Sequence, residues 1–192
     1  MNKMKPRPYQ VEAVDAVFAD ARKYPQDNLQ IAMPTGTGKS VVIAEIAKRV
    51  ADKGGRVLVL ARSKELLVQN NQRYTQIDPK GLQRSGVYSA GLGLRQTEEQ
   101  VTFAGVQSVY KRAAEFGHID AIVVDESHQI SNDKDSQYQQ LIRGLREINS
   151  GCRFIGLTAT RHRQAPSGPC PHEWLPLRTR RHTSHPTWQW PP

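Results

Sequence analysis

Short, mainly apolar runs that alternate with longer amphipathic segments constrain the fold of this chain more than any other feature. Five such runs occur at residues 29–33, 56–61, 101–105, 121–125 and 153–158. Continuous apolar runs of this length predict strands that are buried on both faces, as in a parallel sheet covered by helices. Apolar residues recur at helical spacing within 41–47 and 138–148, and residues 8–23 predict a helix that begins at Pro8. We therefore expect an α/β fold, with a mostly parallel sheet flanked by helices.

The length of 192 residues suits one domain of ordinary size, and 38% hydrophobic with 23% charged residues is typical of globular proteins. No apolar run approaches the roughly 20 residues that a membrane span needs. No apolar stretch follows the basic N-terminus, so we expect a cytoplasmic protein without a secretory signal. The two cysteines, Cys152 and Cys170, form no metal-ligand spacing and no disulfide framework, which agrees with a reducing compartment.

The last 32 residues have a different composition from the rest of the chain. Residues 161–192 contain seven of the twelve prolines, four of the six histidines and all three tryptophans. Prolines this closely spaced exclude a helix or an interior strand. We therefore expect a folded domain over residues 1–160 and a disordered tail over 161–192. The tail is either a genuine proline-rich appendage or a product of translation out of frame, and its composition favours the second origin.

The formal net charge of +9 is unevenly spread. The tail has five arginines against one acidic residue, Glu173, whereas residues 1–160 have 22 basic against 17 acidic residues. A mildly basic domain is compatible with binding to a nucleic-acid backbone, but many soluble enzymes have the same balance. The charge alone therefore leaves the ligand open.

A glycine-rich segment follows the first predicted strand and precedes a predicted helix. Residues 34–40 read Pro-Thr-Gly-Thr-Gly-Lys-Ser. In this order of elements, glycines let backbone amides surround phosphates at the positive end of the helix, a lysine adds a cation, and a serine hydroxyl binds Mg²⁺. The strict motif has a further glycine where this chain has Met33. The segment predicts a phosphate site, with an ordinary glycine-rich loop as the alternative.

Two adjacent acids follow the fourth predicted strand. Residues 122–128 read Ile-Val-Val-Asp-Glu-Ser-His. We expect Asp125 to hold Mg²⁺ and Glu126 to activate the water that attacks the γ-phosphate. Because the carboxyl ends of parallel strands share one edge, Lys39 and both acids are expected to meet one polyphosphate across neighbouring strands. A solvated turn is the alternative for the acids, and a plain surface histidine is the alternative for His128.

Three segments, in this order, resemble motifs I, II and III of the superfamily 2 helicases of the DExH variety. They are residues 34–40, the tetrapeptide at 125–128, and the Thr-Ala-Thr triplet at 158–160. Residues 7–10, 61–66 and 102–108 are similar to further motifs of the same superfamily. Residues 7–10, 58–69, 105–109 and 135–140 are most similar in sequence to the RadD-like DNA-repair helicases. The resemblance covers residues 6–160.

The resemblance implies a RecA-like P-loop NTPase domain that uses ATP and Mg²⁺ and binds nucleic acid, DNA more than RNA. DNA-repair or single-strand-binding proteins are its implied partners. The implied roles are catalysis by Lys39, Asp125 and Glu126, with Mg²⁺ held by Ser40 and Asp125. Nucleotide binding is implied for Arg7, Gln10, Thr35, Gly36, Thr37, Gly38, Lys39 and Ser40. Strand contacts are implied for Arg62 and Gln107, and coupling between the two ligands for His128, Thr158 and Thr160. A solvated helix start remains the alternative for Arg62, and a simple helix cap remains the alternative for Gln107.

The sequence departs from this superfamily after residue 160. There the helicases continue into a second RecA-like domain, whose arginines accelerate the reaction by about 10³- to 10⁵-fold where such fingers act. We expect the present chain to be a truncated ATP-dependent DNA helicase that binds nucleotide poorly and hydrolyses it slowly. The alternatives are a translocase subunit of a restriction system and an inactive nucleotide- or nucleic-acid-binding remnant.

Overall fold

A computed structural model describes residues 4–24, 27–131, 133, 135–159 and 177–181. These residues form one sheet in the order β4-β3-β5-β2-β6-β7-β1-β8, and every neighbouring pair is parallel except β3 and β4. The strands are β1 (Asn28–Ala32), β2 (Val57–Ala61), β3 (Ser85–Ser89), β4 (Leu94–Arg95), β5 (Val101–Gly105), β6 (Ala121–Val124), β7 (Arg153–Thr158) and β8 (Leu177–Arg181).

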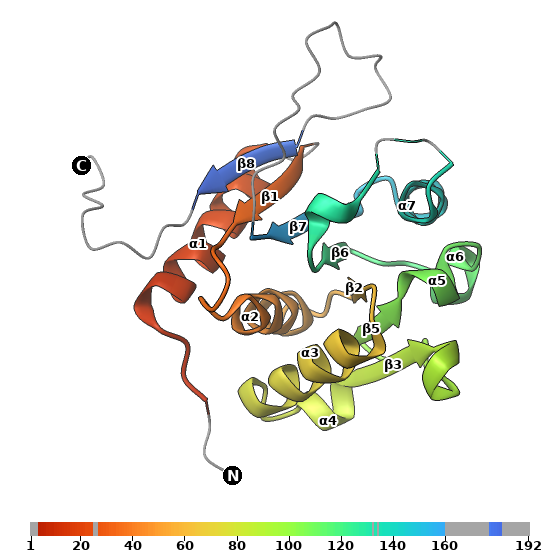
Figure 1. Cartoon of the computed structure of the whole chain (residues 1–192), viewed down its shortest axis with the longest axis horizontal. Helices are drawn as coiled ribbons and strands as arrows, with labels where there is room; N and C mark the ends of the chain where they lie inside the picture. The colour runs from red at the N-terminus through yellow and green to blue at the C-terminus, as the bar shows by residue number, and fades with distance from the viewer. Residues whose placement is uncertain (1–3, 25–26, 132, 134, 160–176, 182–192) are drawn as a thin grey trace, which may run out of the picture.

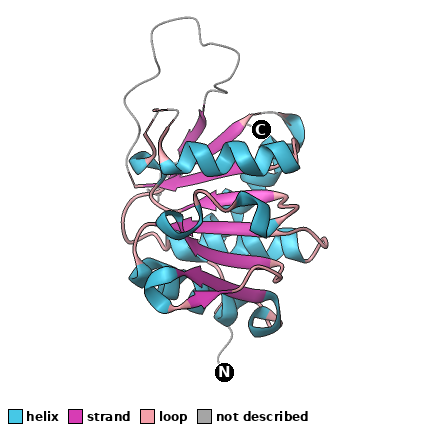
Figure 2. Cartoon of the chain, turned by 90° about the vertical axis from the view of Figure 1, so that its right-hand side faces the viewer, coloured by secondary structure: helices cyan, strands magenta, loops and turns pink. Residues whose placement is uncertain are grey.

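Helices cover both faces of the sheet (Figures 1 and 2). One face carries α1 (Pro8–Lys23), α2 (Lys39–Ala51) and α3 (Lys64–Ile77). The opposite face carries α5 (Val106–Val109), α6 (Ala113–Phe116) and α7 (Gln137–Ile148). The short helix α4 (Gly81–Arg84) follows α3, and single 3₁₀ turns occupy Ala90–Leu92 (η1) and Ser127–Gln129 (η2). The expected α/β fold with a mostly parallel sheet is confirmed.

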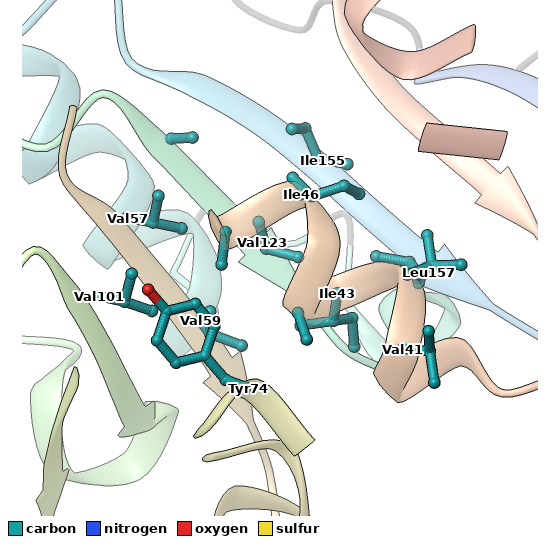
Figure 3. Close-up of a cluster of buried hydrophobic side chains, with 14 of the residues drawn as sticks. Val41, Ile43, Ile46, Val57, Val59, Tyr74, Val101, Val123, Ile155 and Leu157 are labelled. Carbon is teal, nitrogen blue, oxygen red and sulfur yellow. The ribbon is translucent and has the colours of Figure 1, made fainter. Parts of the chain in front are cut away.

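Alternation along each strand divides the core into two layers. In β2, Val57 and Val59 belong to the cluster under α2 and α3, whereas Leu58 and Leu60 belong to the cluster under α5 and α7. Figure 3 shows side chains of α2, including Ile43 and Ile46, packed over the strands of the first cluster. Burying each aliphatic side chain of this size stabilises the fold by about 1.5–3 kcal/mol. Packing on both faces explains why the central strands are apolar throughout.

The predicted elements agree closely with those observed. Helix α1 and strands β5 and β7 have the predicted bounds, and β1, β2 and β6 differ by a single residue at one or both ends. Strands β3 and β4 and most of α3 were not predicted. Strand β3 reads Ser-Gly-Val-Tyr-Ser and ends in serines, so its composition resembles a loop. None of the described helices has both the length and the apolar composition that a membrane span requires.

Strand β8 lies within the tail that was expected to be disordered. Residues Leu177–Arg181 pair in parallel with Asn28–Ala32 of β1, at the edge of the sheet. This five-residue strand falls in the longest proline-free part of the tail, between Pro176 and Pro186, where every backbone N–H is available for pairing. The expectation of disorder therefore does not hold for these five residues. Residues 160–176 and 182–192 lie outside the described part of the chain.

Candidate functional site

The glycine-rich segment forms a tight loop between β1 and α2. The hydroxyl of Thr37 donates a hydrogen bond to the carbonyl oxygen of Pro34 at 2.6 Å, which closes the loop on itself. Gly36 and Gly38 have φ angles of 81° and 77°, in the left-handed region that glycine adopts most readily. Gly38 caps α2 and Lys39 is the first helical residue. The loop thus ends at the positive end of a 13-residue helix, as a phosphate site requires.

Two side chains of α1 hold this loop from outside. The Tyr9 hydroxyl and the Gln10 side-chain amide both donate to the carbonyl oxygen of Thr37, at 2.8 and 2.9 Å. The side-chain oxygen of Gln10, Oε1, accepts a hydrogen bond from the backbone N–H of Arg7 at 2.8 Å. A Cβ atom at Gly38 would lie 2.5 Å from Gln10 Nε2, so a side chain there would displace Gln10. Arg7 is exposed and precedes the helix. Gln10 is therefore part of the loop's support as well as a candidate for base recognition.

Met33 replaces the first glycine of the strict phosphate motif without disturbing the loop. Its side chain is buried, and its backbone N–H donates to the carbonyl oxygen of Thr158 at 2.8 Å. This bond continues the pairing of β1 with β7 by one residue. The backbone at Met33 thus still pairs as part of the sheet, and its side chain packs in the core and not in the phosphate loop.

Asp125 lies directly after β6 and is almost completely buried. The side-chain amide of Asn70, in α3, donates to its Oδ2 at 3.0 Å, whereas Oδ1 is buried without a hydrogen-bond partner. Burial raises the pKa of Asp125 above its usual range, and the negative charge of Glu126 acts in the same direction. The Asn70 hydrogen bond and the charge of Lys39 oppose this shift of the pKa.

Glu126 turns the chain sharply and contacts two further candidate residues. With φ of 54° and ψ of 48°, it is the one non-glycine residue with positive φ in the described chain. Its Oε1 lies 3.1 Å from Nζ of Lys39, and its Oε2 lies 3.2 Å from Nδ1 of His128. The side chains of Lys39 and Glu126 are 13% and 25% exposed, so the pair is partly shielded from water. The phosphate loop and the acidic turn therefore meet, as predicted.

The two strands that carry these motifs are not neighbours, contrary to expectation. Strand β7 lies between β1 and β6 in the sheet. Adjacent strands are about 4.8 Å apart, so β1 and β6 are separated by two such distances. Lys39 spans this separation because it lies beyond the loop that follows β1 and has a long side chain. The site consequently extends over the end of the intervening strand, where Thr158 is buried.

Thr158 provides a link between β7 and the acidic turn. Its hydroxyl lies 3.0 Å from Nδ1 of His128, the same ring nitrogen that faces Glu126. The contact that was expected to join His128 and Thr158 is thus present. Thr160 lies outside the described residues.

The two residues expected to contact nucleic acid lie at the same edge of the sheet. Arg62 follows β2 and is exposed, and its guanidinium donates to Oε1 of Gln129 at 3.1 Å. Gln107 is exposed at the start of α5, directly after β5. Arg62 reaches the turn that carries Glu126, whereas Gln107 is two strands away from β6, since β2 lies between β5 and β6.

The residues that were expected to hold Mg²⁺ fit that ion in part. Mg²⁺ is usually bound by one or two carboxylates together with phosphate oxygens and water. The buried Oδ1 of Asp125 lacks a partner, and a cation would supply the charge that this carboxylate is missing. Ser40 is half-buried in the first turn of α2. Within the described residues, no group of three or more His, Cys, Asp or Glu side chains is arranged to hold a metal by itself.

Three further residues support the site but were given no role by the sequence. Tyr9 holds the phosphate loop, Asn70 holds Asp125, and Gln30 of β1 donates to the hydroxyl of Ser127 at 3.0 Å. Asn70 and Gln30 are each 2% exposed. A polar residue among apolar neighbours, as in the Leu-Gln-Ile run of β1, is the sequence signal that marks such positions.

Comparisons with known proteins agree with this geometry. The sequence model of the family described as "Type III restriction enzyme, res subunit" matches residues 3–163. A "51.5 kDa protein" of Lactococcus phage (isolate 7-9) is 31% identical over 138 residues, which cover 72% of this chain and 25% of that protein. The chain thus spans about a quarter of the length of this curated relative.

Two solved structures, a helicase and an ATPase core, have the same fold. The UvsW helicase from bacteriophage T4 superimposes with a TM-score of 0.62 at 18% identity, covering 82% of this chain and 53% of UvsW. The SWI2/SNF2 ATPase core of Sulfolobus solfataricus, solved in complex with double-stranded DNA, superimposes with a TM-score of 0.63 at 17% identity. That match covers 83% of this chain and 33% of the core. At these identities the likeness establishes the RecA-like helicase fold.

Proposed function

The chain belongs to the family of type III restriction enzyme res subunits, and we propose that its RecA-like domain binds ATP with Mg²⁺ and hydrolyses it in response to DNA. The observation that carries this proposal is the contact between Lys39 and Glu126, with the buried Asp125 beside it. A cation at a helix start and two acids at the carboxyl edge of the same sheet form the arrangement that phosphoryl transfer requires.

The side chains have distinct proposed roles. Backbone amides of residues 35–39 and the ammonium of Lys39 hold the β- and γ-phosphates at the start of α2. Asp125 and Ser40 hold Mg²⁺, which when bound neutralises charge on the phosphate oxygens. Glu126 orients a water molecule and accepts its proton, since its carboxylate is partly exposed and within reach of the phosphate loop.

Coupling to nucleic acid is proposed through the turn that follows Glu126. His128 contacts both Glu126 and Thr158, and Gln129 of the same turn contacts the exposed Arg62. A nucleic-acid strand bound at Arg62 and Gln107 would change the position of this turn and thereby the direction in which the Glu126 carboxylate points. Contacts of this kind are made to the sugar-phosphate backbone and carry no sequence preference.

The biological setting follows from the partners that these motifs recognise. We propose an intracellular DNA helicase or translocase, because ATP, Mg²⁺ and DNA occur together in the cytoplasm. The sequences of residues 7–10, 58–69, 105–109 and 135–140 favour a RadD-like DNA-repair role, with repair or single-strand-binding proteins as partners. The matched family favours the second candidate, a motor subunit of a restriction system.

Single-turnover hydrolysis of labelled ATP separates these possibilities. The wild-type chain is compared with Lys39→Ala, each without DNA and with single-stranded DNA, duplex DNA or RNA. Hydrolysis stimulated by single-stranded DNA supports the repair helicase, and stimulation by duplex DNA alone supports the restriction motor. If MgATP neither binds nor is hydrolysed in any condition, the proposal is wrong and the chain is an inactive remnant.

A further inference from the structure

A buried glutamine in β1 is hydrogen-bonded to the turn that carries Glu126. Gln30 is the central residue of a strand whose neighbours Leu29 and Ile31 are both buried in the core under α2. Because side chains alternate along a strand, Gln30 faces the opposite layer, which is mainly apolar. A buried amide in such a layer is costly unless it is hydrogen-bonded. Its Nε2 donates to the hydroxyl of Ser127 at 3.0 Å, across 97 residues of sequence.

The intervening strand leaves room for this contact by having no side chain. In the register of the sheet, Gln30 is opposite Gly156 of β7, and Gly156 is opposite Val124 of β6. A Cβ atom on Gly156 would lie 2.6 Å from both Cβ and Oγ of Ser127. Ser127 therefore packs directly on the backbone of β7, within reach of Gln30. This close approach is possible only with glycine at residue 156.

The residue before Ser127 is the strained one. Glu126 adopts a left-handed conformation, which is unfavourable for a non-glycine residue and persists only where its surroundings enforce it. Ser127 is 1% exposed and is fixed by the Gln30 hydrogen bond and by its packing on Gly156. In this conformation the Glu126 carboxylate is directed at both Lys39 and His128.

We propose that Gln30 is a positioning residue, which holds Glu126 in its left-handed conformation through Ser127. The inference rests on the proposed function for its catalytic consequence, although its conformational part does not. Strand β1 leads into the loop that ends at Lys39, so the Gln30–Ser127 bond ties the phosphate loop to the acidic turn. The bond thereby fixes the distance at which Glu126 faces the bound phosphates.

The test compares Gln30→Met and Ser127→Ala with the wild type in the full 192-residue chain. Both variants remove the hydrogen bond, one from each side, and Gln30→Met keeps the length of the side chain. Thr102→Val is the matched control: Thr102 is a fully buried polar residue in β5, and its hydroxyl has no partner. The first readout is the intraresidue NOE between HN and Hα of Glu126, which is strong at positive φ. A general loss of stability would leave this NOE unchanged in the folded state.

The second readout is kinetic. Gln30→Met and Ser127→Ala are expected to weaken the NOE and to slow single-turnover ATP hydrolysis by about tenfold or more, with affinity for MgADP within about twofold of wild type. Thr102→Val is expected to leave all three quantities unchanged. If Gln30→Met does not fold, Ser127→Ala decides.

Two results would overturn the inference. One is an unchanged Glu126 NOE in a folded variant that lacks the hydrogen bond. The other is a variant that has lost the NOE but hydrolyses ATP within about twofold of the wild-type rate. A wild-type chain that binds no MgADP would instead refute the proposed function, and the NOE comparison would still decide whether Gln30 fixes the turn.

Discussion

Nζ of Lys39 lies 3.1 Å from Oε1 of Glu126, although one residue begins α2 and the other follows β6 beyond an intervening strand. The ammonium is therefore paired with the carboxylate at the place where the proposed phosphates bind. In the proposed function, a polyphosphate would replace Glu126 as the partner of Lys39, and this exchange would release the carboxylate to contact water. The proposal thus links nucleotide binding to the release of the Glu126 carboxylate through the side chain of Lys39.

Replacing Lys39 tests the phosphate loop. Lys39→Ala is expected to reduce affinity for MgADP by about ten- to a hundredfold, since a hydrogen bond to a charged group contributes about 1.5–3 kcal/mol. Isothermal titration calorimetry measures the change. Lys48→Ala is the control, because Lys48 lies in the same helix and pairs with Asp52 on the surface. Equal affinities of Lys39→Ala and wild type would remove Lys39 from the site.

Replacing Glu126 separates binding from catalysis. Glu126→Gln removes the competitor for Lys39 and a negative charge near the phosphates, so MgADP is expected to bind about two- to fivefold more tightly. Single-turnover hydrolysis is expected to slow by about 10²- to 10⁴-fold, the usual contribution of a general base. Glu147→Gln, at an exposed position of α7, provides the control. Weaker binding with an unchanged rate would contradict both roles.

The buried acid predicts a dependence of stability on pH. Burial raises the pKa of Asp125, so the native state keeps this proton to a higher pH than the unfolded chain does. Where only the native state is protonated, the free energy of unfolding falls as the pH rises. In EDTA, Asp125→Asn is therefore expected to gain stability relative to wild type from acid toward neutral pH. Urea unfolding across this range measures the difference.

The control for this prediction is Asp15→Asn, which changes an exposed acid paired with Arg49. This variant is expected to show no such gain toward neutral pH. If the stability of Asp125→Asn relative to wild type does not rise between acid and neutral pH in EDTA, burial does not penalise the ionised carboxylate as inferred.

Asn70 is predicted to stabilise Asp125. Asn70→Leu removes the side-chain donor to Oδ2 of Asp125. The other oxygen of this buried carboxylate, Oδ1, already has no hydrogen-bond partner. The expected loss is about 1–3 kcal/mol in the free energy of unfolding at neutral pH. Asn71→Leu is the matched control, because the buried Oδ1 of Asn71 has no partner to lose. Losses of equal size in the two variants would show that the hydrogen bond to Asp125 contributes nothing specific.

The sequence predicted those helices and strands that can be recognised from the pattern of residues within the element itself. Strands β5 and β7 and helix α1 had their bounds predicted because each is a run of one periodicity with clear ends. Helix α3 was largely missed because its buried stripe of Leu67, Asn70, Tyr74 and Ile77 includes an amide, and polar side chains occupy most of its other positions. The helical period is present, but an apolar pattern does not detect it.

The sequence predicted that the phosphate loop and the acidic turn would meet, but not the order of the strands that carry them. The glycine loop and the acidic pair have motif signatures, so Lys39 and Glu126 were found together. That β7 separates their strands depends on pairing between residues distant in sequence, which no local pattern reports. The supporting contacts of Asn70 and Gln30 are equally non-local, at separations of 55 and 97 residues.

The central claim is that the phosphate loop and the acidic turn bind one metal–nucleotide complex. Replacing Mg²⁺ by paramagnetic Mn²⁺ tests it directly, because Mn²⁺ broadens the amide resonances of nearby residues in the ¹⁵N-labelled chain. With Mn²⁺ and ADP together, we predict simultaneous broadening of residues 36–40 and 125–127, and its loss in Lys39→Ala. Broadening of only one of these two segments, or of neither, would contradict the account.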